Sequence, residues 1–190
     1  MTRDQMTDMR DNLKIWFEGH RDMHCDYYLQ NRFLPLDQYY ELRSKESGWL
    51  LFTLLVEICA DYSPPESVLK SVPMDTFRVS TTRLALAVDD YITFKTKMAA
   101  NDVTNGLMAY AYIEKCRLQT AIDTQFQLIK DLEAECQSLS DTIATKLDAE
   151  FETPALVLYM NSLIGMSYGM YAGVAILYAY EERDGLLCCP

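Results

Sequence analysis

Long stretches without a helix-breaking residue constrain the fold of this chain more than any other feature of its sequence. The 190 residues contain only seven glycines and six prolines, and no stretch alternates apolar and polar residues with a period of two. The sequence therefore predicts an all-α protein. The expected helices run over Met6–Gln30, from Pro35 to a break at Ser47-Gly48, and over Trp49–Cys59, a short segment after Pro65, Met74–Ala99, Thr104–Lys115, Leu118–Leu147 and Pro154–Arg183.

Size, charge and cysteine pattern narrow the class of protein. No internal repeat or domain boundary is evident, so we expect a single domain over residues 1–190. The net charge of −11 argues against a nucleic-acid partner, because phosphate backbones are bound by basic surfaces. The six cysteines form no CxxC pair, and the N-terminal segment lacks the apolar core of a signal peptide. We therefore expect a reduced, cytoplasmic protein.

The last expected helix allows two interpretations. Thr153–Tyr180 carries no charged residue and is long enough to span a bilayer, and Gly165, Gly169 and Gly173 form a ladder of small residues typical of packed membrane helices. The alternative is a central helix of a large bundle, in which the glycine face admits a neighbouring helix or a ligand. We do not expect a membrane partner, because polar side chains such as Asn161 dilute the segment and no basic residue flanks its start.

A possible cation-binding face lies on the helix expected over Met74–Ala99. Asp89, Thr93 and Lys97 follow one another at intervals of four residues, so they share one face of that helix. A carboxylate and a hydroxyl at this spacing can hold Mg²⁺, which prefers oxygen ligands. Lys97 stands where a third oxygen ligand is expected, and a charged ammonium group cannot ligate a metal.

Arg43 and Glu46 stand just before the break at Ser47-Gly48. A helix break exposes unpaired backbone groups and can respond to a bound anion. The simpler interpretation of Arg43 is a surface arginine near a helix end.

An ordinary structural interpretation is also open for four further residues. Asn105 is suited to cap a helix, and Arg183 is suited to compensate the dipole at the end of the last helix. His20 and His24 could form half of a metal site, or they could be an exposed, partly packed pair.

Taken in chain order, these segments resemble the C-terminal half of a class I terpene synthase, most closely the fungal (basidiomycete-type) sesquiterpene synthases. Pro35–Arg43 is similar to the segment that leads to the family's diphosphate-sensing arginine, and Val88–Phe94 is similar to its Mg²⁺-binding motif. Leu118–Asp123 and Gly173–Arg183 are similar to later segments of the family. The likeness implies a partial class I terpenoid synthase helical bundle lacking the N-terminal helices, that is, a truncated C-terminal metal-binding domain.

The resemblance also implies a role for each motif residue. The implied set is Asp89, Thr93 and Lys97 at the metal positions, Arg43 and Arg183 at the diphosphate, and Glu46 and Ser47 as linker and effector. Lys97 replaces the glutamate ligand of the family, and Tyr178 and Asp184 stand where the family has tryptophan and tyrosine. The family's first, aspartate-rich metal motif has no counterpart, and we expect it upstream of Met1.

Three functions follow as hypotheses. In the first, the protein is a terpene synthase that uses Mg²⁺ to ionise and cyclise farnesyl diphosphate to a sesquiterpene, with release of diphosphate. In the second, it is a catalytically impaired, truncated relative that binds a prenyl diphosphate or a partner chain at most. The third is a small helical membrane or scaffold protein built around Thr153–Tyr180. A shortened bundle would expose apolar helix faces, so we also expect a homo-oligomer.

Overall fold

The computed structural model of the chain describes residues 3–30, 32–147 and 153–183. Within these ranges the regular structure is helical and contains no strand, so the all-α prediction is confirmed. The elements are α1 (Arg3–Met23), the π-helix η1 (His24–Tyr28), α2 (Leu36–Glu46), α3 (Trp49–Ala60), α4 (Glu66–Leu69), α5 (Val72–Ala99), α6 (Gly106–Ile113), α7 (Leu118–Leu147) and α8 (Thr153–Arg183).

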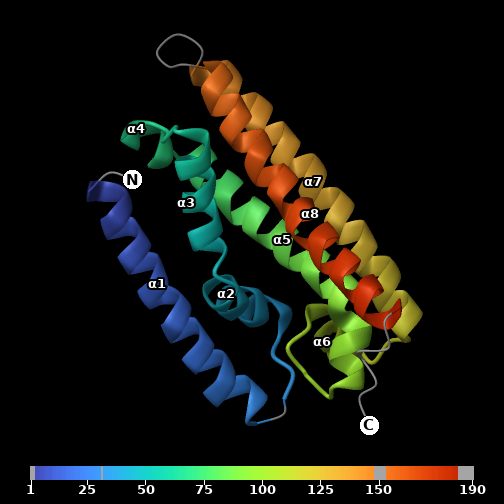
Figure 1. Cartoon of the computed structure of the whole chain (residues 1–190). Helices are drawn as coiled ribbons and strands as arrows, with labels where there is room; N and C mark the ends of the chain where they lie inside the picture. The colour runs from blue at the N-terminus through green and yellow to red at the C-terminus, as the bar shows by residue number, and fades with distance from the viewer. Residues whose placement is uncertain (1–2, 31, 148–152, 184–190) are drawn as a thin grey trace.

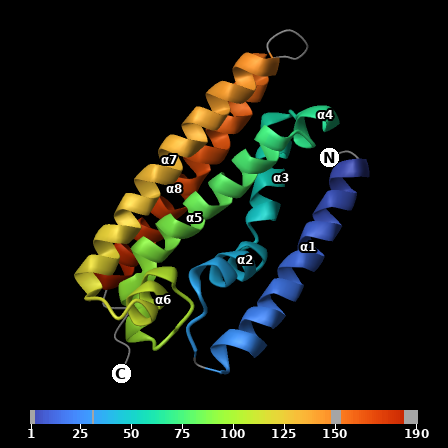
Figure 2. The same ribbon diagram turned by 180° about the vertical axis from the view of Figure 1, so that it is seen from behind.

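Helix α5 is the central element of the bundle. Figures 1 and 2 show α5, α7 and α8 side by side along the length of the molecule, with α2 and α3 on the other side of α5 and α1 outside them. Helix α5 contacts α2, α4, α6, α7 and α8, while α1 packs against α2 and α3. As a result every residue from Leu84 to Asp90 is buried, including two aspartates.

Apolar clusters meet on α5, and two of them hold the neighbouring helices that carry the site. The larger one joins α3, α5, α7 and α8 through side chains such as Trp49, Phe77, Leu132 and Tyr159. The smaller one involves the first helical rod, which is formed by α1 and η1 together. It joins the end of this rod to α2 and α5, and it contains Tyr39 and Leu86 among its buried residues. Burial of these side chains contributes about 1.5–3 kcal/mol each and fixes α2 against α5.

Local capping explains where the sequence-based boundaries differ from the structure. The helix expected over Met74–Ala99 begins two residues earlier, at Val72, and Pro73 lies in its first turn. Ser71 caps this turn by accepting a hydrogen bond from the Met74 amide. The α6 helix starts at Gly106 and not at Thr104, because Asn105 has an extended backbone and caps the helix instead.

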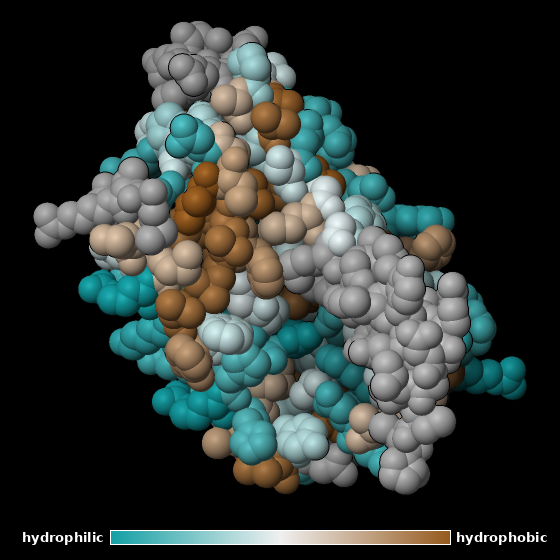
Figure 3. Space-filling model, viewed as in Figure 1, coloured by the Kyte–Doolittle hydropathy of each residue, from teal (hydrophilic) through white to brown (hydrophobic). Residues whose placement is uncertain are grey.

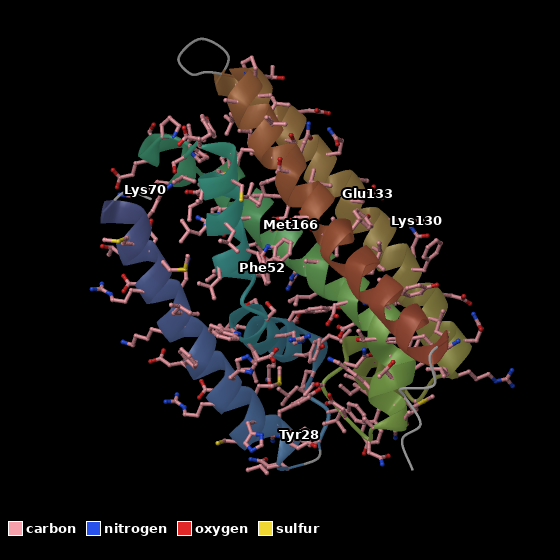
Figure 4. The ribbon with its side chains drawn as sticks, viewed as in Figure 1. Tyr28, Phe52, Lys70, Lys130, Glu133 and Met166 are labelled. Carbon is pink, nitrogen blue, oxygen red and sulfur yellow. The ribbon has the colours of Figure 1, made fainter. Side chains whose placement is uncertain are left out.

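The face shown in Figure 3 carries a continuous apolar area over α3. Leu55 of α3 and Leu158 of α8 are exposed large apolar side chains. Phe52 of α3 and Met166 of α8 are half-buried on the same face, where Figure 4 labels them. Within the part of the chain that the structure describes, no helix combines the length and the apolar character that a membrane crossing needs.

Candidate functional site

Arg43 of α2 and Asp89 of α5 meet where the two helices pack together. The Arg43 Nη2 atom donates a hydrogen bond of 2.7 Å to Asp89 Oδ2. Only 12% of the Arg43 side chain and 11% of the Asp89 side chain are exposed. The interpretation of Arg43 as a surface arginine is therefore wrong, since its guanidinium group is held between helices.

Glu46 is the second carboxylate on Arg43. It forms an ion pair with Nη1 of Arg43 one turn away on α2. Burial opposes the charge of Arg43, but Tyr39, Glu46 and Asp89 raise its pKa well above the ordinary value. Arg43 is thus a permanent cation that two acids already neutralise, which limits its attraction for a further anion until one acid moves away.

The helix breaks directly after the Arg43–Glu46 pair, as the sequence predicts. Ser47 ends α2, and Gly48 adopts a left-handed backbone with φ of 69° before α3 begins. The Ser47 hydroxyl accepts a hydrogen bond from the amide of Trp49, the first residue of α3. Glycine is suited to this position because a side chain would strain the left-handed conformation.

Asp90 lies beneath the ion pair and was not singled out from the sequence. Its side chain is fully buried, and its Oδ1 atom accepts a hydrogen bond of 2.7 Å from the Tyr39 hydroxyl. Its Oδ2 atom has no hydrogen-bond partner within the described part of the chain. Burial raises the pKa of this carboxyl to about 6, although the charges of Arg43 and Lys97 oppose the shift.

The start of α6 closes over Asp90. Asn105 caps α6 through the Met108 amide, as expected, and its side-chain amide also donates a hydrogen bond of 2.8 Å to the Asp90 carbonyl. A Cβ atom built on Gly106 would lie 2.7 Å from Asp90 Oδ2 and 2.9 Å from the Tyr39 ring. Only a residue without a side chain therefore allows α6 to approach this closely.

Thr93 and Lys97 continue the Asp89 face along α5. The Thr93 hydroxyl is buried and donates a hydrogen bond of 2.8 Å to the Asp89 carbonyl. The half-buried Lys97 ammonium group donates a hydrogen bond of 2.6 Å to the Thr104 carbonyl. Lys97 is therefore held at the connection between α5 and α6.

These residues do not complete a three-ligand metal site on α5. Asp89 and Thr93 offer two kinds of oxygen atom, but the Asp89 carboxylate is engaged by Arg43 and the third position is a cation. Within residues 3–30, 32–147 and 153–183, no group of three or more His, Cys, Asp or Glu side chains is arranged to hold a metal ion. We therefore assign no chemical step to a metal at this face of α5.

The two histidines of the first helical rod contact different residues. His20 Nδ1 lies 3.3 Å from Glu46 Oε1, while His24 stacks on Tyr28 in η1. Both histidines are exposed, and neither belongs to a metal-binding group in the described part of the chain. The interpretation of an exposed, partly packed pair describes them best.

Arg183 is the last residue of α8, but its side chain lies outside the residues whose side chains the structure describes. The same holds for the side chain of Tyr178, and Asp184 lies outside the described residues altogether. The structure brings Arg43, Glu46, Asp89 and Thr93 together at the α2–α5 contact, and the position of Arg183 relative to them stays a prediction.

Comparisons with known proteins agree on one family. The family model described as terpene synthase family 2, C-terminal metal binding, matches residues 1–135, more than half of the chain. No curated protein matches the sequence.

Solved structures share the fold at low sequence identity. A variant of cucumene synthase superposes with a TM-score of 0.72 at 16% identity, covering 88% of this chain and 56% of that one. A linalool/nerolidol synthase from Streptomyces clavuligerus gives 0.73 at 16% identity, covering 87% and 56%. The same enzyme in complex with 2-fluorogeranyl diphosphate gives 0.72 at 16% identity, covering 89% and 57%. The chain thus spans little more than half the length of these proteins, and the likeness to them shows the fold alone.

Proposed function

Because this chain belongs to terpene synthase family 2, we propose that it binds a prenyl diphosphate at the α2–α5 contact and contributes to ionising it. The substrate that we propose is farnesyl diphosphate, and the product is a sesquiterpene formed with release of diphosphate. A structural neighbour with a geranyl diphosphate analogue supports this class of ligand. The likeness to fungal enzymes rests on the motifs quoted above and is part of the same proposal.

The observation that carries the proposal is the environment of Arg43. Its guanidinium group lies at the end of α2, beside the helix break and against two carboxylates. A guanidinium presents several N–H donors in a planar fork, which suits the oxygens of a diphosphate. In our proposal the diphosphate takes the place of Asp89 on Arg43, so that Arg43 stabilises the charge that develops on the leaving group.

The other residues of the set act around Arg43. Glu46 keeps Arg43 oriented from the same helix, and Ser47 connects that orientation to the start of α3. Arg183 would bind the diphosphate from the end of α8. The bound metal of the family supplies further charge compensation, and Mg²⁺ is the ion that we propose. On α5 only Asp89 and Thr93 could contribute oxygen ligands to it.

Turnover of farnesyl diphosphate tests this function. The purified protein is incubated with farnesyl diphosphate and Mg²⁺, and the release of diphosphate is measured against a sample without protein and against Arg43→Gln. We expect release by the wild type and a large loss in the variant. Binding without release would favour the catalytically impaired alternative, which the incomplete ligand set on α5 supports. The absence of both binding and release in the wild type would refute the proposal.

A further inference from the structure

One face of α1 packs against the helix break at Ser47-Gly48, between α2 and α3. Asn12, Trp16, Gly19 and His20 follow one another at helical spacing, so they lie on the same side of α1. Asn12 Nδ2 donates a hydrogen bond of 3.2 Å to the Leu50 carbonyl in the first turn of α3. The Trp16 ring lies against Gly48, where a built Cβ atom would be 3.4 Å from the ring.

Gly19 lets this face come into direct contact with the end of α2. A Cβ atom built on Gly19 would lie 2.6 Å from the Glu46 amide nitrogen and 2.8 Å from the Lys45 Cβ atom. Backbone atoms cannot move away as a flexible side chain could, so a larger residue would push α1 off the break. The close approach places His20 next to Glu46.

His20 then connects α1 to the anion-binding arginine. Its Nδ1 atom lies 3.3 Å from Glu46 Oε1, while the other Glu46 oxygen is paired with Arg43. The His20 ring is itself held by an edge contact with Trp16, with ring centroids 5.0 Å apart. A continuous series of contacts therefore runs from Trp16 through His20 and Glu46 to Arg43.

We propose that His20 is a positioning residue that sets the orientation of Arg43 through Glu46, with the Trp16–Gly19 face of α1 holding the α2–α3 break in place. Neither histidine has this role in the sequence-based interpretation. The inference rests on the proposed function for its consequence, because the anion bound by Arg43 is a diphosphate there. The contact between α1 and the break does not depend on that function.

Two variants of His20 and one of His24 test the proposal. His20→Ala removes the contact with Glu46, whereas His20→Asn keeps an N–H donor near the position of Nδ1. His24→Ala is the matched control, because His24 stacks on Tyr28 at the far end of the rod, away from the break (Figure 4). The first measurement is hydrogen exchange of the Ser47–Leu51 amides, and the second is the affinity for inorganic pyrophosphate by calorimetry. Circular dichroism verifies that each variant is folded.

We expect His20→Ala to speed exchange at the break and to weaken pyrophosphate binding about fivefold, as the loss of one ordinary hydrogen bond would. His20→Asn and His24→Ala should stay within about twofold of the wild type in both measurements. Unchanged exchange in His20→Ala would overturn the proposal. Faster exchange with unchanged pyrophosphate affinity would overturn the positioning of Arg43. If the wild type does not bind pyrophosphate, the proposed function fails, and the exchange data alone decide whether α1 holds the break.

Discussion

At the scale of single residues, the buried carboxyl of Asp90 links folding to pH. Its pKa is about 6 in the folded protein against an ordinary value of 3.8, and burial is the main cause. Between these two values the folded state binds more protons than the unfolded state, so stability falls as the pH rises from about 4 to about 6. A shift of about two units corresponds to about 3 kcal/mol.

We predict that Asp90→Asn removes this dependence. An asparagine cannot ionise, so the stability of the variant relative to the wild type should rise by about 2–3 kcal/mol between pH 4 and pH 7. Urea denaturation at several pH values measures the difference. Asp75→Asn removes an exposed aspartate of the same helix and is the control for the loss of one carboxylate. A difference between Asp90→Asn and wild type that stays constant across this range would contradict the assignment.

The positive charge of Lys97 should weaken the binding of Mg²⁺ at the Asp89–Thr93 face of α5. We predict that Lys97→Glu strengthens Mg²⁺ binding by about tenfold, or about 1.4 kcal/mol, because it replaces a repelling cation with an oxygen ligand. Lys95→Glu makes the same change in charge at an exposed position two residues away, and its effect should be much smaller. Calorimetric titration with Mg²⁺ compares the two. Equal gains in both variants would mean that net charge, and not the α5 face, controls metal affinity.

At the scale of helices, the glycines of α8 have open surroundings. Among the described residues, no heavy atom outside the local helix backbone lies within 4 Å of a Cβ atom built on Gly165 or Gly169, and both residues are exposed. Within the described residues they therefore do not provide the close helix contact that the ladder suggested. The surroundings of Gly173 lie outside the described residues.

We predict that Gly165→Ala and Gly169→Ala each stabilise the protein by about 0.5–1 kcal/mol, because alanine lowers the entropy of the unfolded chain and favours the helix. Gly106→Ala is the opposite case and should destabilise, since its Cβ would collide with Asp90 and the Tyr39 ring. Chemical denaturation measures all three. A loss of stability in the α8 variants would show that the glycine face is packed against a partner.

Most helices could be predicted from the sequence, because their apolar patterns are long and their ends carry local signals. The bounds of α7 follow the expected Leu118–Leu147, and the Ser47-Gly48 break lies where the sequence places it. The sequence could not reveal that the end of the first rod widens into a π-helix at His24–Tyr28, because no local residue signals it. The start of α5 lies two residues before the expected Met74, because a helix accepts proline in its first turn.

The site was harder to predict than the helices. The individual positions of Arg43 and Asp89 came from their motifs, but their direct contact depends on how α2 packs on α5. Asp90 has no role in the sequence analysis, because neighbours on a helix point in different directions and only the Asp89 face was considered. The side chain of Asp90 points into the core, and the unbroken apolar run before Asp89 was the available signal. The roles of the full residue set stay predictions.

At the scale of the whole molecule, the chain corresponds to about half of a larger fold. It covers 56–57% of the solved synthases that it resembles, and an apolar area over α3 faces the viewer in Figure 3. An apolar face of this kind is suited to pack against further helices. A homo-oligomer and a cytoplasmic location stay predictions.

Above all, we propose that Arg43, at the α2–α5 contact, binds the diphosphate. Calorimetric titration with farnesyl diphosphate in the presence of Mg²⁺ tests it most directly, using the wild type, Arg43→Gln and Arg83→Gln. Arg83 is an exposed arginine of α5 near Asp37 and provides a control for the loss of one positive charge. We predict saturable binding that Arg43→Gln weakens by about 10- to 100-fold and Arg83→Gln leaves within about twofold. Equal affinities in the two variants, or no binding by the wild type, would contradict it.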